Sequence, residues 1–145
     1  MRILWITNLP TVEIAQDAGL RVQYTGGWLT QISRKVAEKN ELIVAFPLDK
    51  GISSKTGNVN SMQYCSFPSV KKQEEITEKL VESTKEFIHR VNPDIIHIWG
   101  TEYLHSYVFC LACQNLGIMD RTVLYIQGLI SIYKEYYWCY IKTPK

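Results

Sequence analysis

Five short apolar segments alternate with three amphipathic segments along this chain of 145 residues. The apolar segments are rich in β-branched and aromatic residues, and Pro, Gly, Asn or Asp bounds each of them. They cover residues 2–7, 41–46, 62–67, 94–99 and 122–127. Because polar residues interrupt these runs so rarely, they predict strands buried on both faces, as in a parallel sheet.

Helices are predicted where apolar residues recur every three or four positions. The three segments are residues 27–39, about 72–91 and about 103–116. In the first of them Trp28, Ile32 and Val36 share one face, and Gly117 follows the third as expected at a helix C-terminus. The alternation predicts one Rossmann-like α/β domain with three layers and a parallel sheet of about five or more strands. The turn-rich residues 47–61 are predicted to form a loop.

Composition then narrows the class of protein. The chain is 46% hydrophobic and 21% charged, which is typical of a folded domain. A net charge of +2, from 16 basic and 14 acidic residues, is too small and scattered to indicate a nucleic-acid partner. The chain has no apolar run long enough to cross a bilayer, and its first residues lack the pattern of a signal peptide. We therefore expect a cytoplasmic protein, with peripheral contact at the inner face of the membrane left open.

The cysteines have both a chemical and a structural explanation. Cys110 and Cys113 have the spacing of a redox or zinc motif, but this spacing also places two residues on one helix face. No second Cys/His pair with metal-ligand spacing accompanies them. We therefore predict that these residues, together with Cys65 and Cys139, are reduced and mostly buried, and that no metal is bound.

The long connection after the first strand, residues 8–25, is the first candidate site. Ligands of open parallel sheets bind at the carboxyl ends of the strands, where Asn8 lies. Gly26 and Gly27 end the connection at the head of a helix, where a backbone without side chains can approach a ligand near the helix dipole. Alternatively, the two glycines only permit a tight entry into the helix. The G-x-G-x-x-G fingerprint is incomplete, so a nicotinamide cofactor is not expected.

Two further strand ends carry polar residues. Gly100, Thr101 and Glu102 follow the fourth strand, and Gln127 and Gly128 end the fifth. Glu102 could accept a hydrogen bond from a substrate hydroxyl, and the Gln127 amide can both donate and accept. Alternatively, Glu102 lies in a first helical turn and only complements the dipole, and the other pair forms an ordinary turn. Because the three strand ends share one edge of the sheet, we expect them to converge on one crevice.

Two histidines near this edge favour structural roles. His97 alternates with Ile96 and Ile98, which predicts a buried histidine on the opposite face of the strand. His105 is predicted on a helix surface. No Ser/His/Asp or Cys/His arrangement with a suitable spacing accompanies them.

As a set, these motifs resemble the N-terminal half of GT-B glycosyltransferases of the family 4 type. The resemblance covers nearly the whole chain: MRILWITN, then GGWLTQIS, PDIIHIWGTE and VLYIQG. It implies two facing Rossmann-like domains, transfer with retention of anomeric configuration, and no bound metal or cofactor besides the nucleotide-diphosphate sugar donor. On this basis Gly26 and Gly27 would lie near the donor phosphates, and the turn with Glu102 would face a glycan or lipid-linked acceptor. The family often has His where this sequence has Gln127.

The resemblance also implies that the acceptor and the donor bind to two different domains, of which this sequence contains one. Residues 1–145 would be the acceptor-side domain, and a donor-binding domain would have to follow Lys145, so this part alone would be inactive. An aromatic segment near the end, with Tyr137 and Trp138, is expected to dock on this domain or on a further part of the protein. The alternative is a non-catalytic binding module, or one subunit of a split transferase, with those two residues as anchors. A flavodoxin-like or receiver-type regulator is a weaker alternative, because no acidic cluster follows the first strand.

Overall fold

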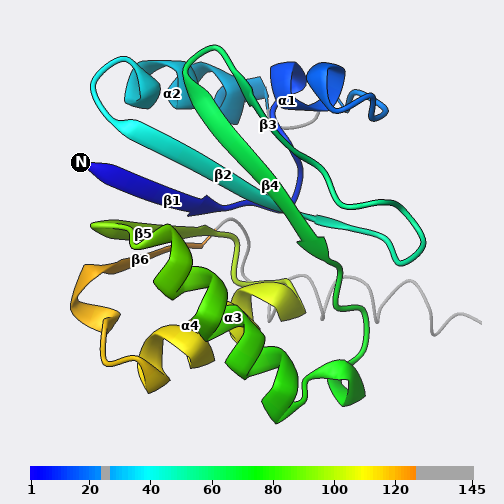
Figure 1. Ribbon diagram of the computed structural model, residues 1–145, viewed down its shortest axis with the longest axis vertical. Coiled ribbons are helices and arrows are strands. Elements are labelled where there is room, and N and C mark those ends of the chain that lie inside the picture. The colour runs from blue at the N-terminus through cyan, green and yellow to red at the C-terminus, as the bar shows by residue number, and fades with distance from the viewer. Residues whose placement is uncertain (24–26, 127–145) are drawn as a thin grey trace, which may run out of the picture.

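The computed structural model describes residues 1–23 and 27–126 as an α/β fold in which helices cover both faces of a six-stranded sheet (Figure 1). The strands are β1 (Arg2–Ile6), β2 (Glu41–Leu48), β3 (Thr56–Val59), β4 (Met62–Pro68), β5 (Ile95–Trp99) and β6 (Thr122–Tyr125). The helices are α1 (Val12–Asp17), α2 (Gly27–Ala37), α3 (Glu78–Val91) and α4 (Leu104–Asn115), with short 3-10 turns at Gln73–Glu75 and Met119–Arg121.

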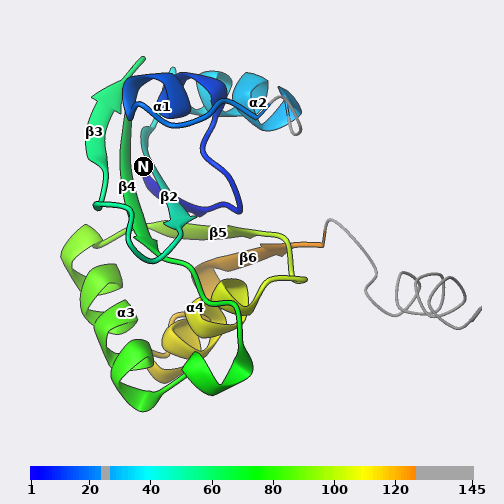
Figure 2. The same ribbon diagram turned by 90° about the vertical axis from the view of Figure 1, so that its right-hand side faces the viewer.

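The strand order is β3-β4-β2-β1-β5-β6, and every neighbouring pair is parallel except β3 and β4. Helices α1 and α2 lie on one face of the sheet, and α3 and α4 lie on the other (Figure 2). This arrangement confirms the predicted Rossmann-like three-layer class. It also brings the carboxyl ends of β1, β5 and β6 to one edge, because adjacent strands that run in parallel end on the same side.

Period-two alternation along the strands divides the core into two layers. On β5, Ile96 and Ile98 are fully buried against α3 and α4, whereas His97 and Trp99 face the other side with Trp5. The layer beneath α1 and α2 contains Trp5, Ile14, Leu42, Val44, Phe46, Met62, Tyr64 and Trp99, among others. The opposite layer contains Leu4, Ile6, Ile43, Ala45, Ile88, Ile96, Ile98 and Phe109, among others.

Three local predictions were wrong. The expected loop at residues 47–61 contains strand β3, which is short and polar but pairs with β4 through a turn at Asn60 and Ser61, both with positive φ. The expected loop at residues 8–25 contains helix α1. The helix expected from about residue 72 begins at Glu78, because the Thr77 hydroxyl caps it by accepting from the Leu80 amide.

Strand β6 leaves apolar surface uncovered by the part of the chain that the structure describes. Val123, Leu124, Tyr125 and Ile126 are all exposed, although β6 pairs with β5 along one side. Exposed apolar strands at a sheet edge invite contact with further protein. Among the helices of the described ranges, none combines the length and the apolar character needed to cross a membrane.

A buried ion pair connects α1 to α2. The Arg34 guanidinium donates to Oε1 of Glu13, a residue that is 7% exposed, whereas the Arg34 side chain is half exposed. The backbone amide of Val12 also donates to Thr30 Oγ1 at 3.3 Å. These contacts fix the start of α1 against both the first and the last turn of α2.

Removing the Arg34 charge should therefore destabilise the fold. We expect Arg34→Ala to lower the free energy of unfolding by about 2 kcal/mol, because the Glu13 carboxylate stays buried without its partner. The control is Lys35→Ala on the same helix, which removes only the exposed pair with Glu38 and should leave the urea midpoint unchanged. Equal midpoints for the two variants would show that Glu13 needs no cationic partner.

Candidate ligand-binding site

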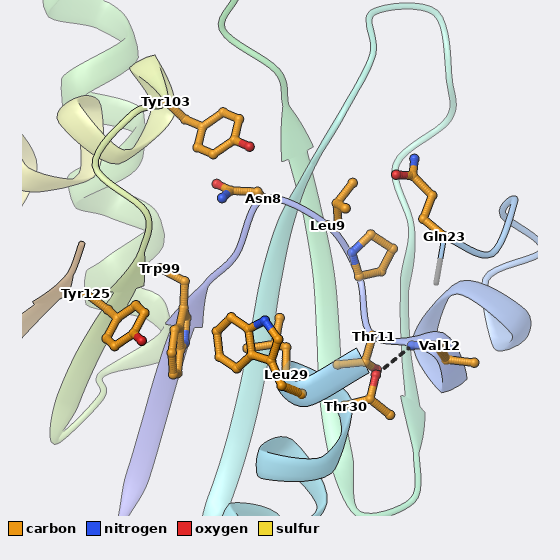
Figure 3. A pocket seen from close by; sticks show the side chains of 12 residues that line it. Asn8, Leu9, Thr11, Val12, Gln23, Leu29, Thr30, Trp99, Tyr103 and Tyr125 are labelled. Carbon is orange, nitrogen blue, oxygen red and sulfur yellow. Dashed lines mark hydrogen bonds between the residues drawn. The ribbon is translucent and has the colours of Figure 1, made fainter. Parts of the chain in front are cut away.

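A cavity of about 430 Å³ opens at the carboxyl ends of β1, β5 and β6 (Figure 3). Its walls come from the loop after β1, the start of α1, the first turn of α2, the ends of β5 and β6, and the turn before α4. The lining residues are Asn8, Leu9, Pro10, Thr11, Val12, Gln23, Trp28, Leu29, Thr30, Trp99, Tyr103 and Tyr125. This position matches the crevice expected where the strand ends converge.

Aromatic rings form one side of the cavity. Trp99 ends β5 and is 5% exposed, and its ring centroid lies 5.1 Å from that of Trp28 and 5.0 Å from that of Tyr125. Trp5 packs 5.0 Å away from Trp99 on the core side. Trp28 and Tyr125 are in contrast 43% and 47% exposed, so their faces are open to a ligand. The buried Trp99 ring contacts both of them, and Figure 3 shows Trp99 and Tyr125 side by side.

Hydrogen bonds shape the opposite side, where the loop after β1 runs toward α1. The Thr7 hydroxyl donates to the Leu9 carbonyl at 2.9 Å. The Thr11 hydroxyl accepts from the Ile14 amide at 3.4 Å and caps α1. Together with the Val12 contact to Thr30, these bonds give this wall a defined shape before any ligand binds.

Asn8 connects this loop to α4. Its Oδ1 lies 3.0 Å from Nε2 of His105, so a neutral ring protonated on Nε2 donates to the amide oxygen. His105 is 4% exposed and packs against the rings of Phe67 and Tyr103. This burial lowers the pKa of His105 to about 4. The prediction that His105 lies on a helix surface was therefore wrong: the first turn of α4 faces the end of β1.

Gly100 lies where Asn8 and Glu102 approach each other. Its φ is +89°, and a Cβ there would lie 2.8 Å from Asn8 Nδ2 and 3.1 Å from both Glu102 carboxylate oxygens. Glu102 Oε2 is buried and makes no hydrogen bond to the described residues. The structure thus brings together Asn8, Gly100 and Glu102, which the sequence assigned to one site.

The other predicted site residues have mixed placements. Glu102 is not in the first turn of α4, because that helix begins at Leu104. Neither Glu102 nor the exposed Thr101 lines the cavity. Gly27 is the first residue of α2, next to Trp28, and open space surrounds the position of a Cβ there. Gly26, Gln127 and Gly128 lie outside the described residues, as do Tyr137 and Trp138.

Reasoning from the sequence missed the aromatic contributors. Trp28 was noted only as one of three apolar residues that share a helix face, and Trp99, Tyr103 and Tyr125 were not singled out. A signal was present, because Trp99 ends one predicted strand and Tyr125 lies two residues before the end of another. The structure ends β6 at Tyr125 and pairs it in register with Trp99 on β5. Aromatic residues that end adjacent parallel strands are thus brought to one edge of the sheet.

His97 lies behind this aromatic group. Its ring stacks on Trp99 with centroids 3.9 Å apart, and burial lowers its pKa. It faces away from Ile96 and Ile98, as predicted, but it is only half-buried. Neither His97 Nε2 nor Trp99 Nε1 has a hydrogen-bond partner among residues 1–23 and 27–126.

No protein-family model, curated protein or solved structure matches this chain. The resemblance to GT-B glycosyltransferases therefore stays a prediction that rests on the motifs and on the site.

The three cysteines that the structure describes do not line this cavity. Cys65, Cys110 and Cys113 are free thiols, and burial raises the pKa of each, that of Cys65 to about 11. Such thiols are poor nucleophiles at neutral pH. Within the described ranges, no group of three or more His, Cys, Asp or Glu residues could hold a metal ion. Cys139 lies outside those ranges.

Proposed function

We propose that this chain is the acceptor-side domain of a retaining glycosyltransferase that uses a nucleotide-sugar donor. One observation carries the proposal: an uncharged cavity with exposed aromatic rings lies at the carboxyl edge of the sheet, beside the glycine that opens α2. Aromatic rings and neutral hydrogen-bonding groups suit a sugar, whose ring has apolar C–H faces and polar edges. The fold and the position of the cavity suit this use.

The proposed roles follow the positions of the residues. The amide groups at the start of α2, near Gly27, would face the donor diphosphate, where the helix dipole favours negative charge. Asn8 would orient acceptor hydroxyls from the cavity wall, and Glu102 would do so from the adjacent turn that Gly100 and Thr101 shape, outside the lining. Gly26, Gln127 and Gly128 keep the roles that the family resemblance gives them. No metal or further cofactor, and no nucleic-acid partner, is part of the proposal.

The reaction is an exchange at the anomeric carbon of the donor sugar. Its bond to the diphosphate oxygen breaks, and its bond to the acceptor hydroxyl oxygen forms. The diphosphate leaves with the electron pair, and the hydroxyl proton passes to that leaving group or to solvent. A second domain would bind most of the donor, and the exposed β6 surface supports a contact with further protein.

Two substitutions in the complete protein test the site. We expect Gly27→Val and Glu102→Ala each to lower sugar transfer at least tenfold without changing the melting temperature. Valine would separate the donor from the α2 amides, and alanine would remove the carboxylate beside Asn8. Radiolabelled nucleotide sugars and chromatographic product analysis provide the measurement, with exposed Lys35→Ala on α2 as the control. Wild-type turnover in both variants would remove these residues from the site.

The alternative, a binding module or a subunit of a split transferase, has one observation in its favour. The uncovered β6 strand, with Val123 and Leu124 exposed and followed by the exposed Ile126, could contact a separate chain as well as a second domain. Size-exclusion chromatography with light scattering distinguishes the alternatives. A complete protein that transfers sugar as a monomer contradicts the split arrangement, whereas activity only after a partner is added supports it.

A further inference from the structure

The walls of the cavity indicate the chemical class of its ligand. Among the twelve described residues that line it, none is Asp, Glu, Lys, Arg or His. Proteins hold diphosphates and other anions mainly with Arg, Lys or helix N-termini. Of the two helix starts in the wall, that of α2 is assigned to the donor, and at the start of α1 the Val12 and Ile14 amides donate to Thr30 and Thr11. Aromatic faces also attract cations, but the described lining contains no carboxylate to balance the charge of one, because Glu102 lies outside it.

The exposed rings indicate how such a ligand is held. Trp28, Tyr103 and Tyr125 are 43%, 42% and 47% exposed, and all three border the same cavity. The face of an aromatic ring carries partial negative charge, which attracts the weakly positive C–H groups on the apolar face of a pyranose. The volume of about 430 Å³ lies within the usual range for small ligands and leaves room for the end of a glycan.

The polar groups of the cavity can bind the hydroxyl groups of a sugar. Asn8 and Gln23 provide amides, and the two tyrosines provide hydroxyl groups that donate and accept. Figure 3 shows Asn8 and Tyr103 near each other on one side and Gln23 on another. Uncharged groups of both kinds can bind sugar hydroxyls without the desolvation cost of a buried charge.

We infer that the cavity binds the terminal sugar of a neutral glycan acceptor, stacked on Trp28 and Tyr125. This inference rests on the proposed function and selects one acceptor class within it. A lipid-linked diphosphate acceptor is the competing class, and the wall that the structure describes offers no cation to bind its phosphates.

The test uses the complete protein and saturation-transfer NMR with defined probes. Maltotriose, cellotriose and N,N′,N″-triacetylchitotriose are the neutral probes, trigalacturonate is the acidic one, and geranyl diphosphate in detergent micelles represents lipid diphosphates. We expect at least one neutral probe to bind and neither anionic probe to compete with it. Binding of an anionic probe alone, or of no probe, overturns the inference.

Matched variants on α2 connect binding to the rings. Trp28→Ala should weaken binding of the neutral probe at least tenfold, whereas Trp28→Phe, which keeps an aromatic face, should stay within about threefold. The control is Ile32→Ala, which removes a residue with a similar exposed fraction, 41%, outside the lining. In transfer assays, Trp28→Ala should raise the acceptor KM far more than the donor KM. Equal effects of Trp28→Ala and Ile32→Ala would overturn the stacked arrangement.

Donor chemistry separates this inference from the proposed function. Transfer from a nucleotide sugar to geranyl diphosphate alone would leave the proposed function standing and overturn the neutral-acceptor assignment. The opposite outcome is also informative: neutral probes bind in a Trp28-dependent way, but the complete protein neither hydrolyses nor transfers a nucleotide sugar. That result would support the glycan-binding site and contradict the proposed transferase activity.

Discussion

Replacing Gly100 by valine is expected to lower the free energy of unfolding by about 4 kcal/mol and to abolish ligand binding in the cavity. With φ at +89°, Gly100 has a backbone conformation that costs a residue with a side chain about 1–3 kcal/mol. The new Cβ would also lie 2.8 Å from Asn8 Nδ2. Asn8 must then move, and its contact with His105 and its place in the cavity wall change with it.

A second glycine, Gly117, separates the effect of backbone strain from that of steric contact with Asn8. Gly117 has a φ of +69°, but no atom lies within 4 Å of the position of its Cβ. Gly117→Val should therefore show only the cost of backbone strain, about half the effect at Gly100. Urea unfolding of both variants provides the comparison, and NMR shifts of the Asn8 amide report the local change. Equal losses of stability at the two positions would mean that steric contact of the new side chain with Asn8 and Glu102 does not destabilise the fold.

Acid is expected to destabilise this domain through His105, by about 3 kcal/mol between pH 6.5 and pH 4. The pKa of this ring falls from an ordinary value of 6.5 in the unfolded chain to about 4 in the fold. Between these values the unfolded state binds a proton that the native state does not, so stability falls as pH falls. Above pH 6.5 both states are neutral, and this contribution to stability is complete.

The measurement compares urea unfolding at several pH values for the wild type and His105→Gln. Glutamine can still donate to Asn8 Oδ1 but does not titrate, so the variant should lose most of the slope between pH 6.5 and pH 4. His97, whose pKa burial also lowers, contributes to the slope in both proteins and cancels in the comparison. His89→Gln, on the exposed side of α3, controls for the loss of an imidazole. Parallel curves for wild type and His105→Gln would refute the assignment to this ring.

The main elements could be predicted because their signals are local. The five predicted strands and three predicted helices rest on periodicity that neighbouring residues carry. Each corresponds to an observed element, and the largest shift is at the start of α3, which begins at Glu78 rather than near residue 72. Strand β3 could not be found in this way. Its Thr-Gly-Asn-Val sequence has little strand character, and pairing with β4 stabilises it. Helix α1 has only six residues, too few for a clear periodic signal.

The sheet edge at which the cavity lies was predicted, but most residues of its wall were not. Asn8, Gly100 and Glu102 meet as expected, because parallel neighbours place their carboxyl ends together. The aromatic wall was missed because each of its rings looks like an ordinary apolar residue in the sequence. His105 was assigned to a surface for a similar reason, since periodicity does not say which helix turn another loop covers.

The sequence by itself determined that this chain forms strands and helices in an alternating order and that polar and glycine residues follow the strands. Those features depend on the preferences of neighbouring residues and on strand direction. Only the tertiary structure decided that Trp28, Trp99 and Tyr125 line one cavity and that Asn8 hydrogen-bonds to a buried His105. Such contacts join residues as many as 97 positions apart, and their geometry depends on how whole layers pack against the sheet.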